Sequence, residues 1–395
     1  MTETQLTNPY ERSLASVRAR GSAKWGTYGE DILAAWVAEM DYETAPEVQQ
    51  AIVEAAGGQL YGYPTAAMET ELAEALAGWY AGTAQFTVAP ERIHSLPDIL
   101  KGIELAISLY SRPGSAVVIP TASYPPFFIV AQALGREVIE VPMLRGDGGW
   151  RLDLDRIDAA FGAGAGTLIL CNPHNPLGHV FSAPEMGEIA EIVERHRGRV
   201  VADEVHAPLT YPGRRWVPYA SVSEVAAGHA VSLMSGSKGW NLAGLKCAQV
   251  ALHSDADAAG WKTLSPLAAH GASTLGMVSN TAAYRAGGAW LARTVDYLDG
   301  NRRLLGEALA DRLPAIRYVP PEGTYLAWLD CAALGLESPQ AFFLEQAKVA
   351  FNDGGQFGAA GQRCVRCNFA TSRQVVEQIV ERMAGALRTR PATAV

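Results

Sequence analysis

The stretch Ser235-Gly236-Ser237-Lys238-Gly239-Trp240-Asn241 directly follows the apolar run Ala230–Met234, which is typical of a buried strand. A lysine just past a strand end, among Ser and Gly residues, lies where α/β sheets usually place their sites. The two serine hydroxyls can bind phosphate oxygens, and Lys246 can supply a second cation that keeps the Lys238 amine partly neutral. The stretch therefore indicates a nucleophilic lysine beside a phosphate site. The alternative is a surface lysine in a flexible loop.

The chain around this stretch has the pattern of an α/β protein. Short apolar runs alternate with amphipathic segments, which predicts βα units and a largely parallel sheet. A helix is expected after Asp98 up to Tyr110, and another after Ser182, where Glu185 completes a capping box. The expected buried strands are 116–119, 137–141, 167–171, 200–203 and 230–234.

The last third of the chain has a different character. A long helix is expected over 281–313, followed by the turn-rich segment 320–325, a strand, a helix from Pro339 and a strand over 363–369. This order predicts a second, smaller α+β domain. Cys364 and Cys367 fall three apart on the last strand and so point to opposite faces, which favours two unrelated buried thiols over a metal or redox pair.

Asp203 ends the apolar strand of the segment Val200-Val201-Ala202-Asp203-Glu204-Val205-His206. A buried carboxylate needs a cationic partner to stay charged, and the protonated ring nitrogen of pyridoxal phosphate (PLP) is such a partner. The alternatives are a helix cap or an ion pair with an arginine. His206 is expected to form hydrogen bonds behind the site rather than to act as a catalyst.

The loop Cys171-Asn172-Pro173-His174-Asn175-Pro176-Leu177-Gly178 follows another expected strand. Its prolines fix a backbone at the carboxyl edge of the sheet, where Asn175 could donate to a phenolic oxygen of the cofactor. The alternative is a purely structural turn, because Asn and Pro favour turns.

Three further groups complete the candidate site. Arg366 lies on the strand 363–369, and a guanidinium binds a carboxylate bidentately, which suits an α-amino acid; the alternative is an ion pair between domains. Tyr124 follows the strand 116–119 and could stack on a ring, or could belong to the core. The backbone N–H groups of Ile99 and Leu100 at a helix N-terminus would face an anion with the favourable end of the dipole.

Composition excludes several classes of protein. The chain has 395 residues, 49% hydrophobic and 18% charged, as in an ordinary soluble globular protein, and its length predicts two or three domains. The net charge of −9 argues against a nucleic-acid partner. No apolar stretch has the length of a membrane span, and no apolar signal core lies near the N-terminus. The odd number of cysteines, five, does not indicate a disulfide framework. A cytoplasmic protein without membrane association is therefore expected.

Taken together, these strings resemble the fold-type I PLP enzymes, which are aspartate aminotransferase-like. Within them the chain is similar to the PatB/MalY-type cystathionine β-lyase branch. The resemblance covers nearly the whole chain and rests on strings that occur in the family's order: Trp36-Val37-Ala38-Glu39-Met40-Asp41-Tyr42, Tyr61-Gly62-Tyr63, Tyr124-Pro125-Pro126-Phe127, 172–178, 203–206, 235–241 and 366–369.

The resemblance implies a three-layer α/β/α large domain over residues 47–285 and a small domain made of residues 1–46 and 286–395. It also implies a homodimer with shared sites, in which Tyr63 reaches the phosphate in the neighbouring subunit. The resemblance implies that Lys238 forms a Schiff base with the cofactor, that Asp203 pairs with the pyridine nitrogen, and that Asn175 contacts the ring oxygen. It implies that Tyr124 stacks on the ring and that Arg366, with the backbone near Ala38, binds the substrate carboxylate. The phosphate contacts that it implies are Ile99, Leu100, Ser235, Ser237 and Lys246.

Three positions depart from the family's pattern. Asp98 stands where a small residue is common, and its acid should be turned away as a helix cap or it would repel the phosphate. Gly239-Trp240 replaces a more usual Thr or Ala followed by an aromatic residue, and Met68 replaces Gly. None of the three removes a catalytic group.

The implied reaction is α,β-elimination from cystathionine or another S-substituted cysteine, giving a thiol, pyruvate and ammonia. An aminotransferase uses the same parts, and a specialised natural-product enzyme acting on an S-cysteine conjugate, even by decarboxylation, stays open. A ligand sensor with this fold is a further alternative, but such regulators carry a basic DNA-binding module, and the Trp36 string begins too early to leave room for one.

Overall fold

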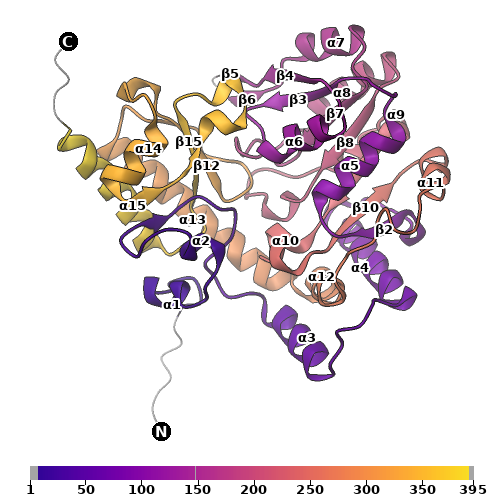
Figure 1. Ribbon diagram of the computed structural model, residues 1–395, viewed down its shortest axis with the longest axis horizontal. Coiled ribbons are helices and arrows are strands. Elements are labelled where there is room, and N and C mark those ends of the chain that lie inside the picture. Colours follow the sequence, from indigo (N-terminus) through magenta and orange to yellow (C-terminus); the bar gives the residue numbers. More distant parts are fainter. Residues whose placement is uncertain (1–7, 147, 391–395) are drawn as a thin grey trace.

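The computed structural model describes residues 8–146 and 148–390, and its largest element is a seven-stranded sheet (Figure 1). The strands lie in the order β2-β10-β9-β8-β7-β3-β4, and only β10 runs against its neighbours. The predicted, mostly parallel sheet is therefore confirmed. The strand bounds are Ile93–Leu96 (β2), Val117–Thr121 (β3), Val138–Pro142 (β4), Thr167–Cys171 (β7), Arg199–Asp203 (β8), Ala230–Met234 (β9) and Ala248–Leu252 (β10).

Helices surround this sheet and continue beyond it. The longer ones are α3 (Pro46–Gly57), α4 (Ala66–Ala84), α5 (Ile99–Tyr110), α6 (Pro125–Ala133), α7 (Leu154–Gly162), α8 (Ala183–Arg195), α12 (Thr274–Ala286), α13 (Gly288–Arg312) and α15 (Arg373–Arg388). The shorter ones include α1 (Leu14–Arg18), α2 (Ala23–Gly26), α9 (Glu224–His229), α10 (Gly236–Gly239), α11 (Asp255–Trp261) and α14 (Pro339–Phe342).

The central strands are apolar on both faces, which is why helices cover both sides of the sheet. In β7, Leu168 and Leu170 pack on one side with apolar residues of α7 and α8. The alternate residues, Ile169 and Cys171, pack on the other side with α5 and α6. The result is the expected three-layer α/β/α arrangement.

A smaller antiparallel sheet lies apart from the large one, with β11 (Arg317–Tyr318), β12 (Leu326–Asp330), β15 (Cys364–Asn368) and β14 (Asn352–Asp353) in that order. The N-terminal strand β1 (Leu33–Ala34) pairs with β13 (Val349–Ala350) beside it. Figure 1 shows the indigo α1 and α2 near the yellow C-terminal elements. The N-terminal strand therefore pairs with a segment more than 300 positions later in the chain. The division into residues 47–285 and residues 1–46 with 286–395 stays a prediction.

The expected single helix over 281–313 was wrong, because the structure has two helices that meet at Gly287. The indole N–H of Trp240 donates to the carbonyl oxygen of Gly287 at 3.1 Å. A Cβ atom on Gly287 would lie 2.3 Å from the same indole nitrogen. The glycine therefore leaves room for a tryptophan that follows the candidate lysine by two residues.

Cys364 and Cys367 belong to different apolar clusters on opposite faces of β15, as expected, and all five cysteines are free and buried. Within the described residues, no helix combines the length and apolar character needed to cross a bilayer. Those same ranges hold no group of three or more His, Cys, Asp and Glu side chains arranged to bind a metal ion.

Candidate active site

A cavity of about 410 Å³ opens at the carboxyl ends of β7, β8 and β9. Parallel sheets place their sites at this edge. Every residue that the sequence predicted for the site, except Tyr63, lines the cavity: Ala38, Ile99, Leu100, Tyr124, Asn175, Asp203, His206, Ser235, Ser237, Lys238, Lys246 and Arg366. Residues separated by more than 300 positions in the sequence thus meet in one place.

Lys238 lies on α10, which begins directly after β9. The Ser235 side chain caps this turn by accepting from the Ser237 N–H at 3.0 Å, and Asn280 accepts from the Gly236 N–H at 2.7 Å. The Lys238 amine donates to the carbonyl oxygen of Ala38 at 3.1 Å. Burial, together with the charge of Arg366, lowers the pKa of Lys238 from 10.5 to about 8. The amine is therefore partly neutral near physiological pH.

Asp203 ends β8, next to the strand that leads to Lys238. It is buried, and its Oδ1 accepts from the Val205 N–H at 3.1 Å. Within the described ranges it forms no ion pair, and burial raises its pKa to about 6 although the Val205 N–H and Lys238 oppose this. A cation placed against Asp203 would hold the carboxylate charged.

Arg366 is buried on β15, and all its hydrogen bonds go to neutral oxygens. Nη1 donates to Oδ1 of Asn175 at 3.1 Å, and Nη2 donates to the Trp36 carbonyl at 3.1 Å and to Oδ1 of Asn352 at 2.7 Å. No carboxylate of residues 8–146 and 148–390 forms an ion pair with it, and its Nε–H has no partner there. The predicted alternative, an ion pair between domains, is therefore not present among these residues.

Two neutral side chains line the cavity near Arg366, and a third lies buried outside the lining. Tyr124 precedes α6 directly, and burial raises the pKa of its hydroxyl. Burial and the nearby charges of Lys238 and Arg366 lower the pKa of His206 far below its usual range, so the imidazole is neutral. His174 is buried outside the lining, and its pKa falls to about 3, also through burial. Because His174 does not line the cavity, the structure gives it no catalytic role.

Another part of the cavity lining holds the groups expected to bind phosphate. Asp98 is the N-cap of α5, as the sequence predicted, and the backbones of Ile99 and Leu100 open the helix. The Ser235 hydroxyl donates to the Cys247 carbonyl at 2.7 Å, so this hydroxyl is already engaged within the protein. Lys246 pairs with Asp98, Nζ to Oδ2 at 2.9 Å.

Residues 36–40, here called the strap, form one wall of the cavity, and residues 36–39 line it. The side-chain amide of Asn241 bonds to both the N–H and the carbonyl of Met40, each at 2.9 Å. Asn368 donates to the carbonyls of Val37 and Glu39 at 2.6 and 2.7 Å. These side chains place the Ala38 carbonyl beside Lys238.

Three of the residues that sequence reasoning did not assign to this site bear directly on its contacts. Asn352 and Glu39 line the cavity, and the Tyr325 hydroxyl donates to the Ala38 carbonyl at 2.9 Å. Asn352 lies opposite Arg366 because β14 pairs with β15 in the small sheet. No sequence motif indicates this strand pairing. Tyr325 was visible only as the end of the turn-rich segment 320–325.

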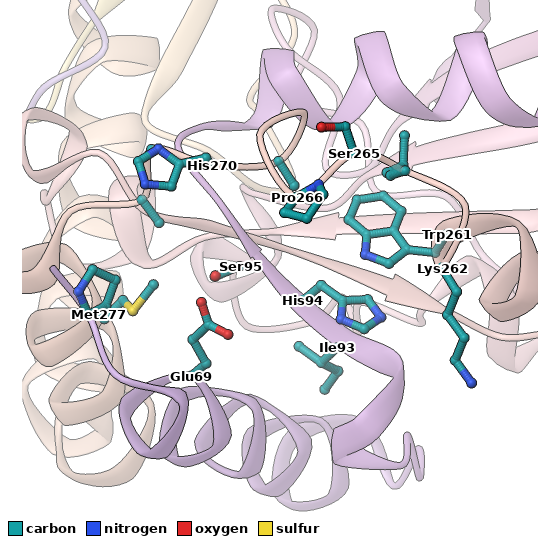
Figure 2. A pocket seen from close by; sticks show the side chains of 15 residues that line it. Glu69, Ile93, His94, Ser95, Trp261, Lys262, Ser265, Pro266, His270 and Met277 are labelled. Atoms are coloured by element: carbon teal, nitrogen blue, oxygen red, sulfur yellow. The ribbon is translucent and has the colours of Figure 1, made fainter.

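Tyr63 lies outside the cavity and is 86% exposed. Its ring lies 6.2 Å from that of His270, and His270 lines a second cavity, of about 310 Å³ (Figure 2). Trp261 and His94 face one another in this second cavity with their rings stacked at 5.2 Å. None of the predicted site residues lines it.

Comparisons with known proteins agree with this arrangement. A family model described as aminotransferase class I and II matches residues 36–383. The chain is 38% identical to a cystathionine beta-lyase of Corynebacterium glutamicum, over 95% of this chain and 99% of that protein. It is 30% identical to the cystathionine beta-lyase PatB of Bacillus subtilis, over 93% and 96%. A crystal structure of a candidate PLP-dependent beta-cystathionase from Corynebacterium diphtheriae superposes with a TM-score of 0.92 at 40% identity, covering 97% and 100%.

Proposed function

The chain belongs to the class I and II aminotransferase family, and from that premise we propose that it is a PLP-dependent C–S β-lyase. The substrate is cystathionine or another S-substituted cysteine. The bond between the β-carbon and sulfur breaks, sulfur leaves as a thiol, and the remaining three-carbon unit is hydrolysed to pyruvate and ammonia. The support is that full-length relatives at 38% and 30% identity carry this activity in their names.

The observation that carries the proposal is the set of unpaired charges around one cavity. Asp203 and Arg366 are both buried, and neither forms an ion pair within the described part of the chain. Buried charges without partners are costly, so each favours a ligand of opposite charge. A protonated pyridine nitrogen suits Asp203, and an α-carboxylate suits Arg366. PLP and an amino acid bound side by side fit both.

The reaction needs a base near the α-carbon, and Lys238 supplies it. PLP, when bound, draws electron density from the α-carbon of its amino-acid substrate. A lysine pKa of about 8 leaves part of the amine neutral at physiological pH, so that Nζ can take the α-proton. The Ala38 carbonyl accepts a hydrogen bond from Lys238 and keeps the amine in place. Arg366 orients the substrate through its carboxylate, while the electron pair of the broken β-carbon bond leaves with sulfur.

The assembly that we propose is a homodimer with shared sites. Large apolar side chains are exposed on α3 and the segment after it: Val53, Leu60, Tyr61 and Tyr63. Figure 1 shows α3 projecting from the body of the molecule. Contiguous exposed apolar groups favour an interface, and in it Tyr63 would contact the cofactor phosphate of the neighbouring subunit. The five free cysteines support a cytoplasmic location, since reducing compartments keep thiols unpaired.

Product analysis tests the proposal. The protein loaded with PLP is incubated with cystathionine and with S-alkyl cysteines, in the absence of any keto acid. Release of thiol and pyruvate in equal amounts is expected, and a Lys238→Ala variant should release neither. Product formation that requires an added amino acceptor would contradict the lyase and identify an aminotransferase. Release of carbon dioxide would instead identify a decarboxylating enzyme.

A further inference from the structure

Asp98 brings a negative charge to the end of the cavity where the cofactor phosphate is expected. Its Oδ1 accepts from the Lys101 N–H at 3.0 Å, which caps α5, and its Oδ2 pairs with Lys246 at 2.9 Å. Asp98 and Lys246 both line the cavity, beside Ile99 and Leu100. The cap bond favours a carboxylate that stays at the helix start when an anion arrives.

The charges at this end of the cavity nearly cancel. Three cationic side chains line the cavity: Lys238, Lys246 and Arg366. Lys238 bonds to the Ala38 carbonyl and Arg366 bonds to Asn175, so Lys246 is the cation that lies beside Asp98. Asp98 is charged at neutral pH: burial raises its pKa, but the bonds from the Lys101 N–H and from Lys246 outweigh burial, and the net shift is downward. An incoming phosphate therefore meets an occupied lysine and a nearby carboxylate, and its remaining attractions among the lining residues are the N-terminus of α5 and the Ser237 hydroxyl.

We propose that Asp98 competes with the cofactor phosphate for Lys246 and so weakens the binding of PLP. This inference rests on the proposed function, since it takes PLP as the ligand. To engage the phosphate, Lys246 must leave Asp98 or share its charge between the two anions. The phosphate then contributes less to cofactor affinity than it would with an uncommitted lysine, which favours exchange of the cofactor.

The test compares cofactor affinity in variants that lose the charge and keep the cap. Asn and Ser both cap helices well, so D98N and D98S preserve α5. The side chains of Asp98 and Lys246 are 37% and 61% exposed, so solvent screens them and the effect is moderate. The Kd of PLP for the cofactor-free protein, measured by tryptophan quenching, is expected to fall roughly three- to tenfold in both variants.

Two controls locate the effect at the phosphate. Pyridoxal lacks that group, and its Kd should change less than twofold in the same variants. Asp153 caps α7 through the Arg156 N–H and pairs with the Arg156 side chain, away from the cavity. D153N removes the same kind of charge and should leave both constants unchanged.

A double-variant cycle tests the competition itself. In the natural protein K246M removes the lysine and also leaves the Asp98 carboxylate uncompensated beside the phosphate, so PLP binding should weaken. In the D98N background the same change should cost more affinity, because Lys246 is there wholly free for the phosphate. Equal losses in the two backgrounds would show that Asp98 and Lys246 act independently and would overturn the competition.

Other outcomes also decide the question. Unchanged or weaker PLP binding by D98N and D98S overturns the inference, as does an equal gain for pyridoxal. Thermal unfolding of the cofactor-free variants shows whether weaker PLP binding reflects misfolding. If D98N proves misfolded, the Kd of PLP for D98S decides the question. A natural protein that binds no PLP at all would defeat the proposed function instead, so the two failures are distinguishable.

Discussion

The amine of Lys238 donates to the carbonyl oxygen of Ala38 at 3.1 Å, across 200 positions of the chain. The same carbonyl accepts from the Tyr325 hydroxyl at 2.9 Å. The candidate lysine, the N-terminal strap and the start of β12 thus meet at one oxygen atom. The geometry of the site therefore depends on how firmly residues 36–40 are held.

Replacing Asp203 should impair the reaction without unfolding the protein. Asn in Asp203→Asn has the same shape but cannot hold a proton on the ring nitrogen as a charged pair. We expect kcat to fall roughly 100-fold or more, since a single electrostatic contact of this kind is worth that much. Thiol release measures it, and Asp203→Glu, which keeps the charge, should retain more activity. Full activity of the Asn variant would contradict the role of Asp203.

Arg366→Lys tests carboxylate recognition. Lysine keeps the charge but loses the planar fork, and it cannot donate to Asn175, Trp36 and Asn352 together. We expect kcat/KM for cystathionine to fall roughly 10- to 100-fold, mainly through KM. PLP affinity should stay within about twofold, because the guanidinium is assigned to the substrate rather than to the cofactor. A variant that loses cofactor and keeps KM would reverse that assignment.

The strap is held from behind by a buried ion pair. Lys24 and Asp41 lie 3.0 Å apart with side chains 1% and 5% exposed, and Lys24 also donates to the Glu39 carbonyl at 3.2 Å. Lys24→Met leaves the carboxylate unpaired, so the free energy of unfolding should drop by about 3–5 kcal/mol. Lys348→Met, which removes an exposed pair with Asp31, is the matched control and should cost under about 1 kcal/mol. Urea unfolding measures the free energy of unfolding of both variants. Equal losses in the two variants would contradict a special role for the buried pair.

The lowered pKa of Lys238 predicts how stability responds to pH in the cofactor-free protein. Between about 8 and 10.5 the unfolded chain binds a proton at this lysine that the folded chain does not. The free energy of unfolding of the natural protein, relative to Lys238→Met, should therefore rise across this window and stay flat below pH 8. A difference that stays constant up to pH 10.5 would mean that the folded pKa is not lowered.

Much of the fold was predictable because its central strands are apolar from end to end. β7 and β9 have the expected bounds, since each apolar run ends in polar loop residues. β10 was missed because its second residue is the polar Gln249. That amide is buried but satisfied, accepting from the Tyr284 hydroxyl at 2.7 Å and lying 3.3 Å from the Cys247 sulfur. The partner that makes a polar residue acceptable in a central strand lies far away in sequence.

In the candidate site too, residues marked by local sequence patterns could be predicted, whereas residues placed by contacts between distant segments could not. The sequence could place Lys238, Asp203 and Asn175 together because each lies at or just after the end of a strand that the sequence marks, and parallel strands end at one edge of the sheet. Asn352 was not found, because only the pairing of β14 with β15 places it against Arg366. The break at Gly287 was missed for a similar reason, since the contact with Trp240 joins distant segments.

The central claim is that Lys238 carries PLP covalently, and reduction with borohydride tests it most directly. The loaded protein is reduced, digested and analysed by mass spectrometry. We predict that the reduced pyridoxyl phosphate adduct is found on the peptide containing Lys238, and that Lys238→Ala yields no labelled peptide while Lys246→Met still does. An adduct on Lys246 or another lysine, or none at all in a protein that turns over cystathionine, would contradict the account.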